Sequence, residues 1–545
     1  MALAAATFFW HLHGLGHGLE LTDESFYLLS SIHADNIRLF FTPWHWIGNA
    51  LWQVSGSIVA FRAVGLGLVT ASAVLLAWGM LRAAPLAGMN APVGRAARWA
   101  TLSSAASGAL LYGSLLSFTP SYNLLSASGA CFAMGLGLLS MTYSGGRAQA
   151  LAVLAGAALG ITILCKFSAG LGVAGLLLGA QAALARRQRA RQFELLLLLA
   201  SVIATVALTV YLKTGFEEAI RQFRAGIEIV WFAQGDKTTV GRVIRSATDV
   251  ASMLANAILA FWGPLACFVL GLKWKPKLLG SIGLAWFAVL LVTNDHLTGG
   301  MSRYTTQALP LVGCLALALL ASTGQWLNND RSVLLCGILL ALPFAVALGT
   351  WNPLQIQIMT ALAPWGAIVG LLGFSSQQAD NRAAWASVLF GTIVLFQVIG
   401  SGDQPYRMHP IGEQTHPVSI DALGTVKVDA KTARLVKDIQ VAARQCGIAP
   451  GAPFLDFYNL PGVALILGAV PVDTPWLLDR DYAAVALRRA DVATLQRAVI
   501  AVKLDANQVR PESPPQLASF PRGFKLCGRA KGPLDDLPIE LWAPV

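Results

Sequence analysis

Long apolar stretches recur along the first 400 residues of this 545-residue chain, and they constrain its fold more than any other feature. A stretch of about 20 apolar residues is long enough to cross a bilayer as an α-helix. Only 12% of the residues are charged and the mean hydropathy is +0.60, which favours a membrane protein. The sequence therefore predicts an α-helical polytopic membrane protein with about 13 transmembrane helices. They are expected near residues 2–20, 60–81, 99–117, 123–143, 148–165, 168–185, 193–212, 250–272, 278–294, 305–323, 333–350, 357–375 and 384–400.

Charge is distributed unequally between the segments that connect these helices. With the amino terminus inside, the inner segments carry 13 basic and three acidic residues, whereas the outer segments up to residue 400 carry ten of each. An excess of Lys and Arg on one side is the positive-inside pattern, so the segment after the last helix is expected outside. The membrane part holds 10 of the net +11 charges (11 − 1). The basic charge thus indicates topology, and no nucleic-acid partner is expected.

The carboxyl-terminal region differs in composition from the rest. Residues 401–545 carry 16 basic and 15 acidic residues, and prolines separate short apolar runs. Helical patterns at 430–445 and 490–500 and a strand pattern at 498–504 predict a small extracytoplasmic α/β domain. About 145 residues are enough for it to bury a core of its own. We expect a transmembrane domain at 1–400, with outer loops at 21–59 and 213–249, and this second domain at 401–545.

Two of the seven cysteines lie in the outer domain. Cys446 and Cys527 are candidates for one disulfide if that compartment is oxidising. The other five stand singly in apolar helices, where a cysteine is usually a buried small hydrophobe.

An acidic pair, Asp23-Glu24, opens the first outer segment, which runs on through Tyr27 to His45. One alternative is an ordinary solvated loop, since loops are where charges normally lie. The other is a functional site, because ionisable groups beside the bilayer are costly and rare in such a chain.

Two single cations accompany the pair on the outer face. Lys166 stands in a hairpin between two apolar helices, and Arg303 stands at the start of another helix, followed by Tyr304. A polar turn at 117–123, ending in Asn123, lies at the same level. Each cation alone is compatible with a side chain that only reaches the lipid headgroups. Together, two cations and a carboxylate pair favour a site for a phosphate-bearing lipid and an acceptor.

In these motifs the chain resembles the bacterial GT-C fold glycosyltransferases, in particular the group related to protein O-mannosyltransferases and the lipid A aminoarabinose transferase. The resemblance covers roughly residues 15–320, the helix count and the outward carboxyl-terminal domain. Several relatives carry a second acid at the turn where this chain has Ser121-Tyr122-Asn123. No metal site is expected, and a divalent metal stays an alternative that no residue pattern indicates.

The resemblance implies an inverting transferase that moves a sugar from a polyprenyl phosphate to a lipid, glycan or protein acceptor, in the bacterial inner (cytoplasmic) membrane with its second domain periplasmic. Lys166 and Arg303 would stabilise the leaving phosphate. Asp23 would be the general base, and Glu24 would orient the acceptor or hold the loop. Weaker candidates for substrate contacts are Tyr27, His45, Tyr304 and Asn123. The alternatives are an O-antigen-type ligase or polymerase and a lipid or solute transporter.

Overall fold

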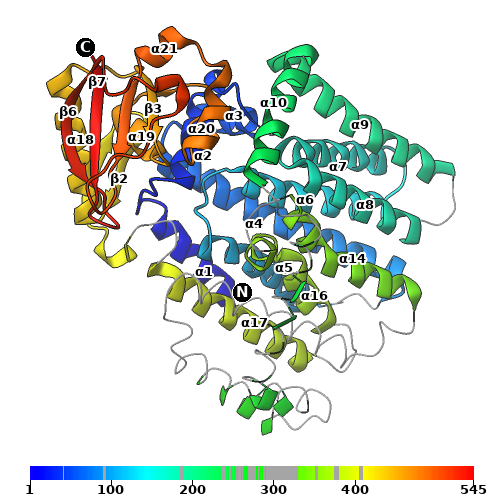
Figure 1. The fold of residues 1–545 in the computed structure, drawn as a ribbon. Coiled ribbons are helices and arrows are strands. Elements are labelled where there is room, and N and C mark those ends of the chain that lie inside the picture. The colour runs from blue at the N-terminus through cyan, green and yellow to red at the C-terminus, as the bar shows by residue number, and fades with distance from the viewer. Residues whose placement is uncertain are drawn as a thin grey trace.

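The structure is a computed structural model of the whole chain. It describes residues 1–40, 42–89, 94–184, 189–234, 329–349, 354–373, 380–403 and 409–545, together with isolated positions between 241 and 289. The expected helices at 250–272, 278–294 and 305–323, with Arg303 and Tyr304, lie largely or wholly outside the described residues. The described part is mostly helical, with a small sheet near the carboxyl terminus (Figure 1).

Five helices among the described residues are long and apolar enough to cross a membrane. They correspond to α4 (Ile58–Ala83, extended by the 3₁₀ turn η2 at Ala84–Ala87), α6 (Tyr122–Ser140), α7 (Gly146–Cys165), α9 (Arg189–Lys213) and α14 (Asp330–Ala347). The other described helices before the second domain are α1 (Ala2–Gly14), α2 (Asp23–Ile32), α3 (Trp44–Ser55), α5 (Arg95–Leu110), α8 (Phe167–Leu184), α10 (Phe216–Gln234), α15 (Leu354–Met359), α16 (Ala363–Gly373) and α17 (Asp380–Gly400). The single helix expected at 357–375 is therefore two helices.

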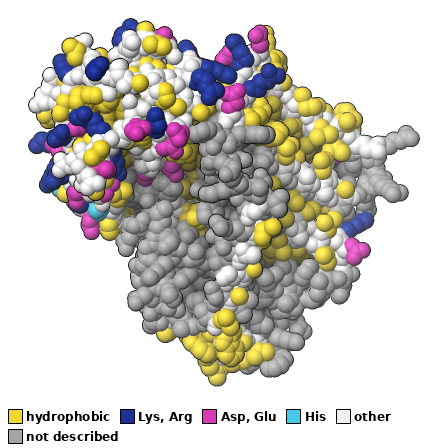
Figure 2. All heavy atoms as spheres, in the orientation of Figure 1, with side chains coloured by type: hydrophobic (Ala, Val, Ile, Leu, Met, Phe, Trp, Pro, Cys, Tyr) yellow, Lys and Arg dark blue, Asp and Glu magenta, His cyan; other side chains and the backbone are white. Residues whose placement is uncertain are grey.

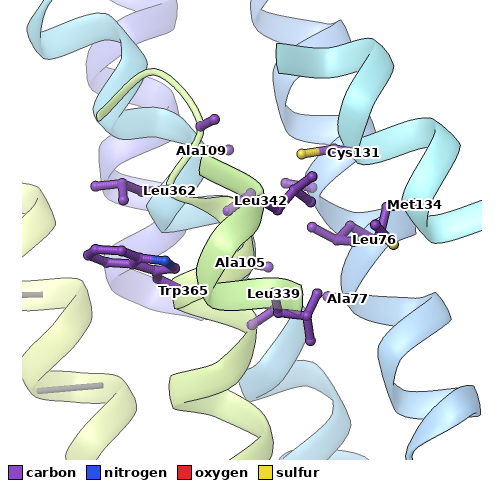
Figure 3. Packing of buried hydrophobic residues seen from close by; sticks show 14 of the residues in the cluster. Leu76, Ala77, Ala105, Ala109, Cys131, Met134, Leu339, Leu342, Leu362 and Trp365 are labelled. Atoms are coloured by element: carbon purple, nitrogen blue, oxygen red, sulfur yellow. The ribbon is translucent and has the colours of Figure 1, made fainter. Parts of the chain in front are cut away.

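Close helix packing in the membrane part depends on small residues. Where α4 meets α6, a Cβ built on Gly79 would lie 2.5 Å from the carbonyl oxygen of Gly135. Backbones approach this closely only where side chains are absent, as is common between membrane helices. Figure 3 shows the adjoining apolar contacts, with Leu76 of α4, Met134 of α6 and Leu342 of α14 among the buried residues.

The first helix is shorter than the sequence pattern predicts. The apolar stretch continues to residue 21, but α1 ends at Gly14. The residues after Gly14 form backbone hydrogen bonds with the second domain instead of continuing the helix. The Gly18 N–H donates to the Lys427 carbonyl (2.7 Å), and the Lys427 N–H donates to the Gly16 carbonyl (2.9 Å). Residues 16–18 thus pair with a strand of the second domain, a tertiary contact that hydropathy does not reveal. The expected helix at 2–20 is wrong beyond residue 14.

The second domain is built on a five-stranded sheet in the order β4-β3-β5-β7-β6. Strands β3 (Pro453–Phe457), β4 (Val470–Pro471) and β5 (Val499–Lys503) are parallel, while β6 (Phe524–Lys531) and β7 (Pro538–Pro544) are antiparallel. A separate hairpin pairs β1 (His416–Ile420) with β2 (Gly424–Val428). The helices are α18 (Ala430–Cys446), α19 (Pro461–Leu467), α20 (Arg480–Ala486) and α21 (Val492–Gln496).

Local sequence explains where α18 begins and ends. The Asp429 carboxylate accepts the N–H groups of Lys431 and Thr432 as an N-cap, and Gly447 adopts φ +66° at the other end. The helix expected at 490–500 is wrong over most of its length. Only the five residues of α21 are helical, because the β-branched run from Val499 joins the centre of the sheet as β5.

The second domain has two apolar clusters, and one of them is shared with the helical part. The buried members of the first, such as Phe457, Ile500 and Trp542, all come from the second domain, as expected. The other joins Leu28 and Leu29 of α2 to residues of the sheet and its helices. Backbone bonds add to this contact, from the Ile58 N–H to the Leu423 carbonyl (3.0 Å) and from the Gly462 N–H to the Leu21 carbonyl (2.9 Å). Sequence did not predict this shared cluster.

Charged and apolar side chains are distributed differently over the surfaces of the second domain and the helical part. Lys, Arg, Asp and Glu side chains gather over the second domain and near α10, while the described parts of α7 to α9 show mainly apolar side chains (Figure 2). This distribution suits a water-exposed domain on one side of a lipid-facing helical part.

Cys446 at the end of α18 and Cys527 in β6 form a disulfide, with Cα atoms 5.6 Å apart and a sequence separation of 81. Closing a loop of this length stabilises a domain by roughly 4 kcal/mol in the chain-entropy model. We therefore expect a reducing agent, or Cys446→Ser, to lower the stability of the outer domain by about this amount. The measurement is thermal unfolding of the purified protein. Alkylation of both Cys446 and Cys527 in unreduced protein, detected by mass spectrometry, would contradict the disulfide. Cys336, a free cysteine buried in α14, is the control for a thiol outside any disulfide.

Candidate active site

Helix α2 begins at Asp23, so the acidic pair forms its first turn. Carboxylates are favoured there by the positive end of the helix dipole. The two side chains have different surroundings, because Asp23 is partly exposed whereas Glu24 is fully buried.

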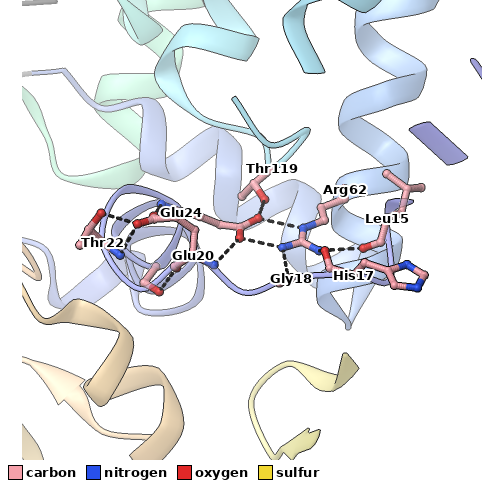
Figure 4. Close-up of polar contacts among 9 residues, drawn as sticks. Leu15, His17, Gly18, Glu20, Thr22, Glu24, Arg62 and Thr119 are labelled. Atoms are coloured by element: carbon pink, nitrogen blue, oxygen red, sulfur yellow. Dashed lines mark hydrogen bonds and ion pairs between the residues drawn. The ribbon is translucent and has the colours of Figure 1, made fainter. Parts of the chain in front are cut away.

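Glu24 is held by Arg62, which lies in the second turn of α4. The Arg62 Nε donates to Glu24 Oε1 (2.8 Å) and its Nη2 donates to Oε2 (2.7 Å), forming a bidentate pair that is buried on both sides (Figure 4). Thr119 Oγ1 also donates to Oε1 (2.6 Å), and the Glu20 N–H donates to Oε2 (3.2 Å). The four acceptor positions of the carboxylate are thereby filled.

Arg62 likewise uses its whole hydrogen-bonding capacity. Besides Glu24, its remaining N–H groups donate to the carbonyls of Leu15 (2.8 Å), His17 (3.1 Å) and Gly18 (2.8 Å). The five donors of a guanidinium are therefore all occupied. This one side chain fixes both the entry to α2 and its first turn against α4 (Figure 4).

A close backbone approach brings Thr119 into this network. Gly65 lies one turn beyond Arg62 on α4, and a Cβ there would be 1.8 Å from the carbonyl oxygen of Phe118. Only glycine allows the polar turn at 117–121 to lie so near α4.

Burial alone would raise the pKa of Glu24, but the Arg62 charge and its hydrogen bonds, with those from Thr119 and the Glu20 backbone, lower it below its ordinary value. Glu24 is thus an ionised carboxylate with no capacity left for an acceptor. Of the two roles expected for it, holding the loop agrees with this geometry and orienting the acceptor does not.

Glu20 is a second buried carboxyl group beside Asp23. It accepts the N–H of Thr22 (2.8 Å), the N–H of Glu24 (2.7 Å) and the Thr22 hydroxyl. Burial raises the pKa of Glu20 to about 8, these hydrogen bonds oppose the change, and the neighbouring Asp23 charge adds to it. Burial therefore favours the protonated form of Glu20 near neutral pH.

This raised pKa predicts a pH dependence of stability. Between about pH 4.5 and 8 the folded protein keeps the Glu20 proton while the unfolded chain has lost it, so stability falls as pH rises through this window. Glu20→Gln imitates the protonated form and should remove this component, on the order of a few kcal/mol by pH 8. Thermal unfolding from pH 4 to 9 measures it. The exposed Glu217→Gln is the matched control, and identical pH profiles for wild type and Glu20→Gln would contradict the prediction.

Aromatic side chains surround the exposed end of α2. We call Phe26, Tyr27, Trp44 and Tyr122 the aromatic cluster. The ring of Tyr27 is edge-on to Trp44 (5.6 Å between centroids) and to Tyr122 (5.8 Å). Asp23 lies close enough to the Tyr122 hydroxyl to interact with it electrostatically. Asp23 and Tyr27, both in α2, therefore lie near Tyr122, the first residue of α6.

Asn123 follows Tyr122 and is buried. Its Oδ1 has no hydrogen-bond partner within the described part of the chain. An unsatisfied buried acceptor is rare and marks a place where a ligand or water can donate.

Lys166 lies where α7 ends and α8 begins. It is only 4% exposed, and its Nζ donates to the Val346 carbonyl near the end of α14 (2.9 Å). The preceding residue, Cys165, accepts the Thr42 hydroxyl (2.8 Å) and packs in one cluster with Tyr27 and Trp44. The structure thus connects the Lys166 hairpin with the aromatic cluster. Among the described residues, the printed partner of this ammonium group is the Val346 carbonyl, which occupies one of its three N–H donors.

His45 is not placed like a catalytic group. It is 1% exposed, and its ring packs against Phe40 and Trp46 at centroid distances of 4.6 and 5.5 Å. Burial lowers its pKa to about 3, so it is a neutral core side chain. Among the described residues no three His, Cys, Asp or Glu side chains form a group suited to a metal ion.

Sequence reasoning missed Arg62, Thr119 and Glu20. A signal was present for Arg62, because a single charge inside an apolar helix demands a partner. Glu20 was included in the helix expected at 2–20. Thr119 belongs to the polar turn expected at the level of the acidic pair, but only the fold shows that it binds Glu24.

Comparison with protein-family models finds no match, and comparison with curated proteins finds none either. Among solved structures, the chain is similar to the archaeal oligosaccharyltransferase AglB from Archaeoglobus fulgidus in complex with an inhibitory peptide and a dolichol-phosphate, with a TM-score of 0.45 and 11% identity over 92% of this chain and 69% of that one. A second Archaeoglobus fulgidus oligosaccharyltransferase, tethered to an acceptor peptide, gives 0.44 and 12% over 92% and 68%. The arabinofuranosyltransferase AftD from Mycobacteria gives 0.44 and 13% over 100% and 39%. At this level of similarity, function has to be argued from the residues of the chain itself.

Proposed function

We propose that this membrane protein is an inverting glycosyltransferase that takes its sugar from a polyprenyl phosphate. The observation that carries the proposal is the first turn of α2. There, one partly exposed carboxylate, Asp23, is presented beside the aromatic cluster by a buried Glu24–Arg62 pair. A buried ion pair and several hydrogen bonds that hold one short helix in place are typical of a site that needs a positioned carboxylate.

The chemistry requires a base near the acceptor and positive charge near the donor. An acceptor hydroxyl attacks the anomeric carbon, and the new C–O bond forms as the bond to the phosphate oxygen breaks. The phosphate leaves with the bonding electron pair, and Asp23 takes the hydroxyl proton. Inversion follows from this single displacement.

Lys166 is our proposed donor-side cation. It lies in the hairpin whose Cys165 packs against the aromatic cluster, and a nearly buried ammonium stabilises developing phosphate charge better than an exposed one. Arg303, outside the described residues, is the second cation proposed from the sequence. The helical membrane part with a small α/β domain agrees with the architecture that the GT-C resemblance implies.

The test uses purified protein in lipid nanodiscs with a panel of polyprenyl-phosphate sugars and candidate acceptors. We expect one donor to be consumed, with release of polyprenyl phosphate and an inverted glycosidic bond in the product. Failure to cleave any donor, combined with movement of an intact lipid-linked sugar across proteoliposomes, would instead establish a transporter.

The outward orientation of the site and of the second domain, in a bacterial inner membrane, is also a proposal. It is supported by the 13-to-3 excess of basic residues in the inner segments and by the direct packing of the second domain on α2.

A further inference from the structure

Trp476 of the second domain lies against the helix that carries Asp23. Its ring stacks on Phe26, with 5.0 Å between centroids and an interplanar angle of 29°. Phe26 is three residues after Asp23 in α2, and residues so spaced share one face of a helix. Trp476 is therefore one side chain away from the proposed base.

The loop that carries Trp476 is fixed to the membrane part. The N–H groups of Arg38 and Leu39 both donate to the Asp473 carbonyl, at 3.0 and 3.2 Å. Asp473 adopts φ +58°, a left-handed conformation that aspartate tolerates better than most residues other than glycine. Two hydrogen bonds from the first outer segment thus hold the turn before Trp476 in the position that puts its ring on Phe26.

The indole of Trp476 has an unused donor. Its Nε1 is shielded from solvent and has no hydrogen-bond partner in the part of the chain that the structure describes. Buried tryptophan N–H groups normally find an acceptor, as Trp542 does with Glu540 Oε2 (3.1 Å). Asn123, in the first turn of α6 and next to Tyr122 of the aromatic cluster, has a buried Oδ1 that likewise has no hydrogen-bond partner among the described residues.

We propose that Trp476 contacts a sugar ring of the substrate, so that the site is shared between the two domains. A sugar presents C–H groups that pack on aromatic faces and hydroxyl groups that accept an N–H or donate to an amide oxygen. Phe26 and Trp476 provide the aromatic rings and the N–H group, and Asn123, which follows Tyr122 of the aromatic cluster, provides the amide oxygen. The inference rests on the proposed glycosyl transfer and names the part of the site that recognises the sugar.

The experiment measures binding in the Asp23→Asn background, so that turnover does not interfere. The probes are farnesyl phosphate linked to mannose, galactose or arabinofuranose, methyl glycosides of the same sugars at millimolar concentration, and unglycosylated farnesyl phosphate. Trp476→Phe keeps the ring and removes the N–H, and it should weaken binding of a sugar-bearing probe about 3- to 10-fold. Trp476→Ala should weaken it further, and affinity for farnesyl phosphate should stay unchanged in both variants.

Trp542→Phe is the matched control, because it also removes an indole N–H from the second domain, but one that Glu540 already satisfies. It should lower the melting temperature without changing sugar affinity. Weakening confined to the lipid-linked sugars identifies the donor sugar, and weakening of the methyl glycosides identifies an acceptor sugar. Equal affinities for the Asp23→Asn parent and both Trp476 variants made in it would overturn the assignment and leave the proposed function standing. Absence of sugar binding to the folded Asp23→Asn parent and to folded wild-type protein would overturn both.

Discussion

Asp23→Asn should reduce transfer by roughly 10² to 10⁴-fold, the usual contribution of a general base. Asparagine keeps the shape and one acceptor oxygen of the side chain, but it cannot take the proton of the attacking hydroxyl. The change lies at a partly exposed position, and the network that holds α2 involves Glu24, Arg62 and Thr119, so donor binding and folding should remain near wild type. Steady-state turnover with the identified donor, with binding measured separately, gives the result.

Asp35→Asn is the matched control for this variant. Asp35 is an exposed acid in the same outer segment, in the 3₁₀ turn η1 (Ala34–Asn36), and its replacement should leave transfer unchanged. Full activity of Asp23→Asn would remove the base from the mechanism and would leave the acidic turn with a structural role alone.

Glu24→Gln should have the largest effect on stability. It leaves the Arg62 guanidinium buried without a counter-charge, and breaking one side of a buried ion pair typically costs about 3 to 5 kcal/mol. Transfer per folded molecule should fall less than in Asp23→Asn, because Glu24 acts by positioning α2. Thermal unfolding in detergent or nanodiscs, followed alongside turnover, separates the two effects.

The double variant Glu24→Gln/Arg62→Met tests the physical reason. Removing both charges eliminates the uncompensated cation, so the double variant should be more stable than Glu24→Gln alone. The exposed pair Arg480–Glu512 provides the control: Glu512→Gln should change stability little. If Glu24→Gln unfolded no more easily than Glu512→Gln, the buried pair would not be what holds α2.

Hydropathy was sufficient for the membrane helices that the structure describes, because a span must be about 20 residues long and apolar whatever its neighbours are. It placed α7 and α9 within a few residues of their ends and put Lys166 at the break between α7 and α8. It failed at residues 15–20. These residues include two glycines, His17 and Glu20, and are less apolar than the helix before them. Their carbonyls bind Arg62 and their backbone pairs with Lys427, contacts about 45 and 400 residues away in the sequence.

Contacts between residues far apart in the sequence also limited what could be predicted about the candidate site. Asp23, Tyr27 and Lys166 were chosen from residue type and membrane level. In the structure Tyr27 belongs to the aromatic cluster, and Lys166 follows Cys165, which packs with Tyr27 and Trp44. The different roles expected for Asp23 and Glu24 came from the resemblance alone, and residue pattern could not choose between the two roles left open for Glu24, because that choice depends on its burial against α4. Residue pattern also gave no reason to look at Trp476, whose relevance depends on how the last 145 residues pack on α2.

The core shared between α2 and the second domain has a consequence for biogenesis. Leu28 and Leu29 are among the first residues to leave the ribosome, and most of their partners in the cluster are made after residue 420. At about 5 to 20 residues per second, roughly 20 to 80 s separate the two events. During that interval only the early members of the cluster, such as Trp52 and Phe61, can cover the apolar side of α2. The packing around the segment that bears Asp23 is therefore complete only after the second domain has been made.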